Sequence, residues 1–276
     1  MLTSFFLASL LGPIGRETIT FQVDGLARTA LVFRPTVDIK GKLPVYFVFH
    51  GLGGNAEQAS KQFHVQDLDP TALVIYGQGL PTSGFNSGAS GAESRIGGFG
   101  QRGGARQSFG QGASKLGGIG GKNSWQIMPK QFGDRDVHFV QSMIQWADQN
   151  GADSSRRFYV GHSNGSYFGW VVLQELGSQF TRFVGLNGPA AFPLKGVPAK
   201  PAFLTTGTDD KLVAESKVQQ FADTLAKING CGAGSGSPVK TYPGSNPVYL
   251  YDYQGGHMPP ADAYKMAVKF CQTGRV

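Results

Sequence analysis

The sequence lacks the motifs that hold metals and nucleotides. It has only two cysteines and five histidines, and neither cysteine has a second Cys or His at the spacing of a metal site. No phosphate loop with Lys-Ser or Lys-Thr occurs, and no Gly-x-Gly-x-x-Gly opens a helix after the first strand of a βαβ unit. We therefore expect no metal site and no cofactor.

Long hydrophobic runs are also absent. The apolar segment MLTSFFLASLLG at residues 1–12 is shorter than the ~20 residues that cross a bilayer, and it lacks the basic start of a good signal peptide. We interpret residues 1–15 as a truncated export signal or a retained apolar strand or helix. Cys231 and Cys271 either form a disulfide in an oxidising compartment or are unpaired core thiols. Both features favour export, so we expect a secreted or periplasmic protein without a membrane span.

Glycine and positive charge are in excess, and both are concentrated in one segment. Residues 84–122 hold 14 of the 41 glycines and contribute +4 of the net charge of +7. The segment is so poor in Leu, Ile and Val that it cannot bury enough apolar surface to offset chain entropy. We expect a long Gly-rich loop inserted into one globular domain over residues 16–276.

The remaining sequence alternates between strand-like and helix-like segments. Short segments rich in Val, Phe, Tyr and Leu predict strands at residues 18–23, 29–33, 45–49, 73–76, 158–160, 183–186, 202–206 and 248–251. Apolar residues at helical spacing predict helices over 136–149, 212–228 and 261–270. This alternation predicts an α/β fold, with a mostly parallel sheet covered by helices on both faces and an antiparallel hairpin at its N-terminal start.

One turn in this pattern presents a reactive side chain. The segment Gly161-His-Ser163-Asn-Gly165 has the form Gly-x-Ser-x-Gly, which holds a serine hydroxyl at the carboxyl edge of a sheet. Gly161 and Gly165 are needed because a Cβ there would collide with the neighbouring strand and helix backbone. An ordinary Gly-Ser turn would also explain five residues, but the strand before and the helix after favour a nucleophile elbow.

A serine hydroxyl needs a base to take its proton and an acid to orient that base. In folds with this elbow the acid and then the histidine follow the serine along the chain. His257 is the one histidine after Ser163 and follows the last predicted strand, so we interpret it as the base rather than as a solvent-exposed loop residue. Asp209 and Asp210 both follow the strand at 202–206, and either is a candidate acid or a cap of the next helix.

The negative charge of an acyl-transfer intermediate needs preorganised backbone N–H groups. We expect one from Asn164, directly after the serine. The other is expected from Leu52, in the loop His50-Gly51-Leu52-Gly53-Gly54 after a predicted strand. His50 is interpreted as a support of this loop rather than as a second base.

Together these segments resemble a known family. The stretches FHGLGG, IYGQGLPT, SWQ, FGDRDVHFV, GHSNGSYFG, GTDDKLV, NGC and GGHMPP are similar to those of α/β-hydrolases of the serine carboxylesterase group. This group includes polyhydroxybutyrate depolymerase-like, feruloyl esterase-like and acetylxylan esterase-like proteins. The resemblance covers most of the chain from about Val45 onward.

The resemblance implies roles for particular residues. Ser163, Asp210 and His257 correspond to the catalytic triad, and Asp210 is thereby preferred to Asp209. Leu52 and Asn164 correspond to the oxyanion donors, and Trp125 and His162 are expected to contribute to substrate binding. Departures from the family are the long connection from Thr82 to Trp125, Ser166 in place of a frequent third glycine, and Cys271, which is not the familiar disulfide partner of Cys231.

The implied activity is serine ester hydrolysis through an acyl-enzyme, on short-acyl, aromatic or polymer-borne esters. A non-catalytic hydrolase-fold binding protein is an alternative, against which the complete order of the triad argues. A single-stranded nucleic-acid binder is another, through Arg102, Phe99 and Phe109 in the insertion. Because only three Arg and two Lys are spread over its 39 residues, we expect no nucleic-acid partner. The insertion leaves the carboxyl end of a strand, so we expect it near the ligand cleft.

Overall fold

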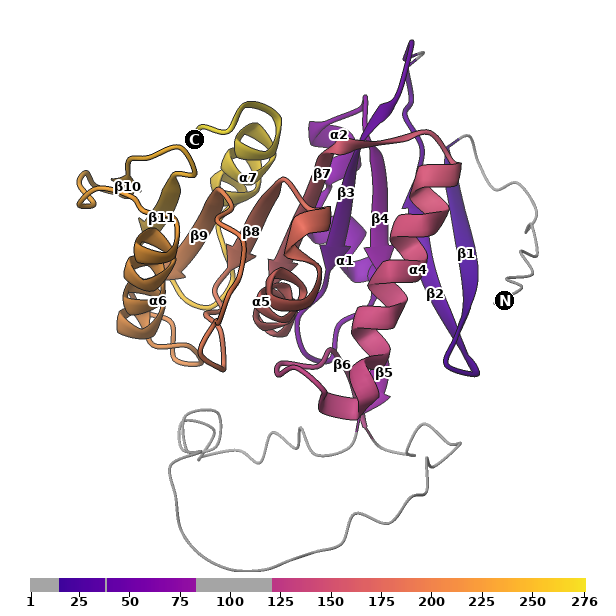
Figure 1. Ribbon diagram of the computed structural model, residues 1–276, viewed down its shortest axis with the longest axis horizontal. Coiled ribbons are helices and arrows are strands. Elements are labelled where there is room, and N and C mark those ends of the chain that lie inside the picture. The colour runs from indigo at the N-terminus through magenta and orange to yellow at the C-terminus, as the bar shows by residue number, and fades with distance from the viewer. Residues whose placement is uncertain (1–14, 38, 83–120) are drawn as a thin grey trace, which may run out of the picture.

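A computed structural model describes residues 15–37, 39–82 and 121–276 (Figure 1). Its sheets are built from β1 (Arg16–Val23), β2 (Leu26–Phe33), β3 (Leu43–Phe49), β4 (Leu73–Gly77), β5 (Leu80–Thr82), β6 (Lys122–Ser124), β7 (Ala152–His162), β8 (Arg182–Leu186), β9 (Ala202–Gly207), β10 (Val239–Tyr242) and β11 (Val248–Tyr253). Its helices are α1 (Ala56–Phe63), α2 (Val65–Leu68), α4 (Arg135–Gln149), α5 (Asn164–Leu176), α6 (Glu215–Ile228) and α7 (Ala261–Thr273), with short 3-10 helices η1 (Gln131–Asp134) and η2 (Gly177–Gln179).

Nine strands form one sheet in the order β1-β2-β4-β3-β7-β8-β9-β11-β10. From β4 through β11 neighbouring strands run parallel. The hairpin β1–β2 is antiparallel, and its turn at Asp24 and Gly25 uses positive φ angles of 51° and 76°, which suit a tight hairpin turn. The mostly parallel sheet and its N-terminal hairpin confirm the predicted fold class.

Helices cover both faces of the sheet, as Figure 1 shows. The apolar residues of α4, α5 and α6 pack in one core, and those of α1, α2 and α7 pack in the other. Along β3, Phe47 and Phe49 point into the first core, while Tyr46 and Val48 point into the second. A strand buried on both faces needs apolar side chains at successive positions, which explains the continuous run in β3.

The predicted strands and helices are all present. Most ends shift by a few residues, but β7 begins at Ala152, six residues before the predicted start. The helix predicted from Leu212 begins three residues later, at Glu215. The reason is local, because the backbone N–H groups of Leu212 and Val213 donate to Asp210 Oδ1 at 2.8 and 3.0 Å. Helix α1 was not predicted, although Asn55 caps it by accepting from the Gln58 N–H at 2.8 Å.

The apolar segment predicted over 1–15 and the Gly-rich loop predicted over 84–122 lie almost wholly outside the described residues. Thr82, which precedes the insertion, and Lys122, its last residue, are described and pair with each other in the antiparallel pair β5–β6. Nowhere in the described part of the chain is a helix long and apolar enough to cross a bilayer. Cys231 and Cys271 are free thiols, so the disulfide interpretation is wrong and the free-thiol alternative holds.

Candidate active site

The carboxyl ends of the parallel strands bring the predicted site residues to one edge of the sheet. Leu52 follows β3, Ser163 follows β7, Asp210 follows β9 and His257 follows β11. Open α/β sheets bind ligands at this edge, where loops from separate strands converge. Residues that are far apart in the sequence therefore meet around Ser163.

Ser163 lies in a strained turn between β7 and α5. Its φ is 53° and its ψ is −119°, a conformation that residues with a side chain rarely adopt. The turn fits only because its neighbours are glycines: a Cβ on Gly161 would lie 2.3 Å from the Gly165 carbonyl oxygen, and one on Gly165 would lie 2.3 Å from the Phe49 oxygen. The backbone N–H of Ser163 donates to the Leu186 carbonyl at 2.8 Å, which holds the turn against β8.

A continuous chain of hydrogen bonds runs from Ser163 through His257 to Asp210. His257 Nε2 lies 2.7 Å from Ser163 Oγ, and His257 Nδ1 lies 2.8 Å from Asp210 Oδ2. An ionised carboxylate only accepts hydrogen bonds, so Nδ1 carries the proton and Nε2 is left to accept the serine proton. This is the arrangement of a general base oriented by an acid.

The surroundings of Asp210 keep its carboxylate ionised. Burial raises its pKa, since the side chain is 1% exposed. Hydrogen bonds from His257 and from the backbone N–H groups of Val213 and Leu212 outweigh burial and lower the pKa to about 2. Asp209 is exposed, and its backbone N–H donates to the Gly255 carbonyl at 2.8 Å. Of the two candidate acids, the structure therefore brings Asp210 to the histidine.

Two backbone amides next to Ser163 are available to bind an anionic oxygen. Asn164 is the first residue of α5, where an N–H has no acceptor one turn earlier in the helix. Leu52 follows Gly51, whose added Cβ would lie 3.3 Å from Ser163 Cβ. Within the described ranges, neither the Leu52 nor the Asn164 backbone N–H makes a hydrogen bond.

Trp125 supports these amides from behind. Its ring is 0% exposed and stacks on Phe168 at a centroid distance of 5.5 Å. The indole Nε1 donates to the His50 carbonyl at 3.0 Å, and the Trp125 backbone N–H donates to Asn164 Oδ1 at 2.8 Å. The sequence predicts that Trp125 contributes to substrate binding. Its ring has no exposed surface, and its contacts are with the loop after β3 and the first residue of α5, so that role stays a prediction.

His162 is buried next to His257. Its Nε2 lies 3.0 Å from the His257 carbonyl oxygen. Burial lowers the pKa of His162 to about 4, so the ring is neutral near pH 7 and Nε2 carries its single proton to reach that carbonyl. The structure therefore joins His162 to the backbone of His257, and its predicted part in substrate binding stays a prediction.

His50 fixes the loop that contains Leu52. Its Nδ1 lies 2.8 Å from the Gly51 carbonyl oxygen, and its Nε2 accepts a hydrogen bond from the Gly79 backbone N–H at 3.0 Å. Burial lowers the pKa of His50 to about 4, so this neutral pattern of one donor and one acceptor persists near pH 7. These contacts are those of a structural support.

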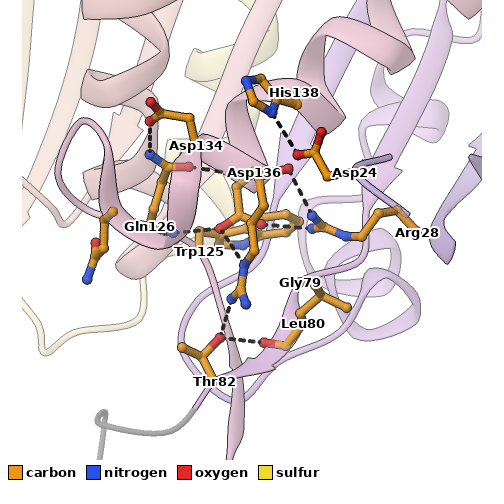
Figure 2. A network of polar contacts seen from close by, with 12 residues as sticks. Asp24, Arg28, Gly79, Leu80, Thr82, Trp125, Gln126, Asp134, Asp136 and His138 are labelled. Atoms are coloured by element: carbon orange, nitrogen blue, oxygen red, sulfur yellow. Dashed lines mark hydrogen bonds and ion pairs between the residues drawn. The ribbon is translucent and has the colours of Figure 1, made fainter. Parts of the chain in front are cut away.

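A buried ion pair anchors the segment that carries Trp125 (Figure 2). The backbone N–H of Gln126 donates to Asp136 Oδ2 at 2.9 Å, and Arg28 Nη2 lies 2.9 Å from Asp136 Oδ1. Arg28 is in β2 and Asp136 is in the first turn of α4. The network thus ties the N-terminal hairpin to the residue that supports the two amides. Buried pairs of this kind are costly to break on one side.

Two further polar side chains near the site were not identified from the sequence. Asn187 directly follows β8, and Tyr253 is the last residue of β11. Asn187 donates to Asp210, and Tyr253 donates to the carbonyl of the residue before His257. Neither belongs to a short motif; the available signal is that a polar residue ends a strand at the carboxyl edge of the sheet.

Comparison with known proteins supports the fold. The sequence matches no family model and no curated protein. Among solved structures it resembles an acetyl xylan esterase from Aspergillus awamori, with a TM-score of 0.62 and 11% identity, over 92% of this chain and 99% of that one. It also resembles the Bacillus cereus carboxylesterase, with a TM-score of 0.57 and 14% identity, over 89% and 93%. A ferulic acid esterase gives a TM-score of 0.58 and 13% identity, over 93% and 95%.

These similarities confirm that the chain has the α/β-hydrolase fold. The structural neighbours are a carboxylesterase, an acetyl xylan esterase and a ferulic acid esterase, which confirms a resemblance in fold to esterases of this kind. At this identity the comparison defines the fold, and the chemistry must be argued from the site itself.

Proposed function

We propose that the protein is a serine hydrolase that cleaves carboxylic esters through an acyl-enzyme. The observation that carries the proposal is the hydrogen-bonded chain from Ser163 through His257 to Asp210, which begins at a strained elbow. The two open amides beside Ser163 add a place for the charge that develops during acyl transfer.

In the first half of the reaction, Ser163 Oγ attacks the ester carbonyl carbon while His257 Nε2 takes the serine proton. The carbonyl oxygen becomes an oxyanion and accepts hydrogen bonds from the backbone N–H groups of Leu52 and Asn164. As the intermediate collapses, the carbon–oxygen bond to the alcohol breaks and His257 gives that proton to the leaving oxygen. Asp210 stays ionised throughout, since its pKa is about 2, and it stabilises the imidazolium.

In the second half, water replaces the alcohol. His257 Nε2 takes a proton from the water as its oxygen attacks the acyl carbon, and the same two amides hold the oxyanion. Collapse breaks the bond to Ser163 Oγ, which takes the proton back from His257. The products are a carboxylic acid and the original enzyme.

For the substrate we propose short-acyl or aromatic esters, including esters carried on a polymer. The names of the structural neighbours, an acetyl xylan esterase and a ferulic acid esterase, support acetyl and aromatic acyl groups. Parallel assays with p-nitrophenyl butyrate, methyl ferulate, acetylated xylan and a polyester film would rank them. Turnover of none of the four would contradict the proposed range.

The reaction is tested with a small ester and a covalent probe. The purified protein is expected to hydrolyse p-nitrophenyl acetate and to react with a fluorophosphonate, and peptide mass spectrometry should place the phosphonate on Ser163. Ser163→Ala should lose both properties. Ser216→Ala, at an exposed position of α6, serves as the matched control and should retain both. A wild-type protein that does neither, or a Ser163→Ala variant that does both, would overturn the proposal.

We also propose export to the periplasm or the medium. The proposal rests on the apolar segment at residues 1–15 and receives no support from the cysteines, which are free. Fractionation of cells that express the full chain tests it, and recovery in the cytosol alone would contradict it.

A further inference from the structure

Asn187 is a buried polar residue in an uncommon conformation. It is wholly buried and has a φ of 53°. Asparagine tolerates this left-handed region better than most residues with a side chain. The backbone there places the Asn187 amide between the loop of the acid and the loop of the base.

The hydrogen bonds of the Asn187 amide fix its orientation. Its Oδ1 accepts from the Thr205 hydroxyl at 2.7 Å. Its Nδ2 donates to Tyr253 Oη at 2.8 Å and to Asp210 Oδ2 at 3.2 Å. A reversed amide would place its oxygen against the Asp210 carboxylate, so electrostatic repulsion excludes that alternative.

Tyr253 continues the network to the histidine. Its hydroxyl uses its proton to donate to the Gly256 carbonyl at 2.7 Å, while its oxygen accepts from Asn187. Gly256 directly precedes His257 in the chain. The amide of Asn187 thus joins the carboxylate that orients the base to the backbone that carries the base.

We infer that Asn187 and Tyr253 are positioning residues that hold the Asp210 loop and the His257 loop in register. The inference rests on the proposed function, since it assigns the two residues to that same reaction. The loops leave different strands, β9 and β11, and a small change in their relative position would lengthen the bond between His257 Nδ1 and Asp210 Oδ2. Catalytic groups lose much of their effect when displaced by about 1 Å.

The direct test removes each link in turn. Asn187→Gly deletes the amide and suits the positive φ, and Tyr253→Phe deletes the hydroxyl with little change in volume. Both are expected to lower kcat on p-nitrophenyl acetate by roughly 10–100-fold, the usual loss when a hydrogen bond to a charged or buried group is broken. KM should change little, because neither residue is assigned a contact with substrate.

Neighbouring residues supply matched controls. Thr205 and Thr206 are both wholly buried, but only the Thr205 hydroxyl bonds to Asn187, whereas Thr206 Oγ1 has no partner in the described part of the chain. Thr205→Val should therefore lower kcat, and Thr206→Val should not. Tyr251→Phe, two residues before Tyr253 on the same strand, should also leave kcat unchanged.

A second readout does not depend on turnover. The Nδ1 proton of His257, hydrogen-bonded to Asp210, is expected to give a far-downfield proton NMR signal in the wild-type protein. This signal should shift or broaden in Asn187→Gly, Tyr253→Phe and Thr205→Val, and persist in Thr206→Val and Tyr251→Phe. Circular dichroism identifies any variant that fails to fold. The positioning role is then judged from kcat and the NMR signal of the variants that do fold.

The outcomes separate the inference from the proposed function. Loss of kcat and of the downfield signal in the folded network variants, with both retained in the controls, supports the inference. Wild-type kcat and an unchanged signal in those variants overturn it. If the wild-type protein neither hydrolyses esters nor reacts with fluorophosphonate, the proposed function fails, while an unchanged NMR signal in the variants would still overturn the positioning role.

Discussion

The two sides of Ser163 are held by different kinds of contact. On the base side, Asp210 and His257 form a charge-assisted hydrogen bond of 2.8 Å, and His257 keeps 16% of its side chain exposed. The other side holds the Leu52 and Asn164 amides, and we call it the oxyanion side after their proposed role. Its backbone is held by neutral groups: His50 Nδ1 bonds to the Gly51 carbonyl, and Trp125 Nε1 donates to the His50 carbonyl. The charges on this side, Arg28 and Asp136, are buried together behind Trp125.

The difference fits what each side would have to do in the proposed reaction. A general base exchanges protons with substrate and water, so it needs access to solvent and a carboxylate that stays ionised. Oxyanion donors must keep one orientation and gain nothing from titration. Burial prevents His50 from titrating near pH 7, because it lowers the pKa of the ring to about 4 and so keeps the ring neutral. Histidine is thus a buried support at position 50 and, at position 257, a partly exposed ring that is proposed to act as the base.

The largest effect is expected where both sides depend on one residue. In Gly161→Ala the new Cβ would lie 2.3 Å from the Gly165 carbonyl oxygen. The clash is with backbone atoms of α5, which cannot move aside as a flexible side chain could. We expect little folded protein and no ester hydrolysis. Gly232→Ala is the control, since its Cβ would meet Pro243 at 3.4 Å, an ordinary contact. Circular dichroism and turnover measure both variants, and an active Gly161→Ala protein would contradict the elbow geometry.

Asp210→Asn breaks the base side alone. The amide cannot stabilise the imidazolium and can donate a proton to His257, which favours the wrong tautomer, so kcat is expected to fall by roughly 10³–10⁴-fold. Asp209→Asn should leave kcat unchanged, because Asp209 is exposed and contacts the base loop through its backbone. Steady-state kinetics of the two variants distinguish the neighbouring carboxylates. Equal losses in both would contradict the assignment.

Arg28→Met breaks the anchor of the oxyanion side. It leaves the buried Asp136 carboxylate with only the more distant Arg135, whose Nε lies 3.8 Å from Asp136 Oδ2. Breaking a buried pair on one side typically costs about 3–5 kcal/mol of unfolding free energy, and the remaining cation places the expected loss toward the lower end. The exposed pair Arg16–Glu57, with 44% and 40% of the side chains exposed, provides the control, and Arg16→Met should cost less than about 1 kcal/mol. Urea unfolding compares them. Similar losses in the two variants would show that the buried pair has no special role.

Buried groups on both sides of Ser163 make the stability depend on pH. Burial lowers the pKa of His162, on the base side, to about 4 as well, so substitutions are needed to assign each part of the dependence. Burial lowers the pKa of His50 from 6.5 to about 4, and the pKa of Asp210 is lowered from 3.8 to about 2. Between these values the unfolded chain binds protons that the folded chain does not, so stability falls as the pH falls. His50 acts from pH 6.5 to about 4, and Asp210 acts from 3.8 to about 2. Each contributes at most about 1.4 kcal/mol per pH unit.

We therefore expect His50→Gln to reduce the slope of unfolding free energy in the upper range, and Asp210→Asn to reduce it only in the lower range. Urea titrations from about pH 7 to about pH 2 measure both slopes. A wild-type slope for His50→Gln above pH 4 would mean that this histidine is not buried as a neutral ring.

The smallest effect on catalysis is expected from shortening the insertion. Replacing residues 84–120 with a short turn keeps β5, β6 and Trp125, so kcat on p-nitrophenyl acetate should be unchanged. The unfolding free energy should rise by no more than about 2 kcal/mol, because the cost of closing a loop grows only with the logarithm of its length. Loss of activity on the soluble ester, with the fold retained, would show that the oxyanion side depends on the removed residues.

The sequence predicted what depends on local pattern and chain order. Continuous apolar runs identified the strands buried on both faces, and the Gly-x-Ser-x-Gly turn identified Ser163 because strain and glycine spacing are local properties. His257 and Asp210 followed from their order after Ser163. The choice between Asp209 and Asp210 came from the family resemblance, and in the structure it is Asp210 that reaches His257.

What the sequence did not predict depends on contacts between distant segments. Asn187 lies 23 positions from Asp210 and 66 from Tyr253, and no spacing rule connects them. Trp125 shows the opposite case, in which the sequence suggested a contact that the fold does not offer. Its position in the family suggested contact with substrate, but the ring is buried against Phe168 and the loop after β3. Side-chain amides and buried rings therefore need the three-dimensional structure to be given a role.

The pairing of β5 with β6 has a consequence for how this fold can change. Because Thr82 and Lys122 are paired, the chain leaves and re-enters the sheet edge at adjacent points, and Ser124 leads directly to the residue that supports the oxyanion amides. Segments of very different length and composition are compatible with this connection, because both of its ends are held by other elements. Arg135 Nη2 donates to Thr82 Oγ1 at 2.6 Å, and Asn123 Nδ2 donates to the Gly54 carbonyl at 2.9 Å. A domain inserted between Thr82 and Lys122 would therefore lie next to the candidate active site and would leave the core unchanged.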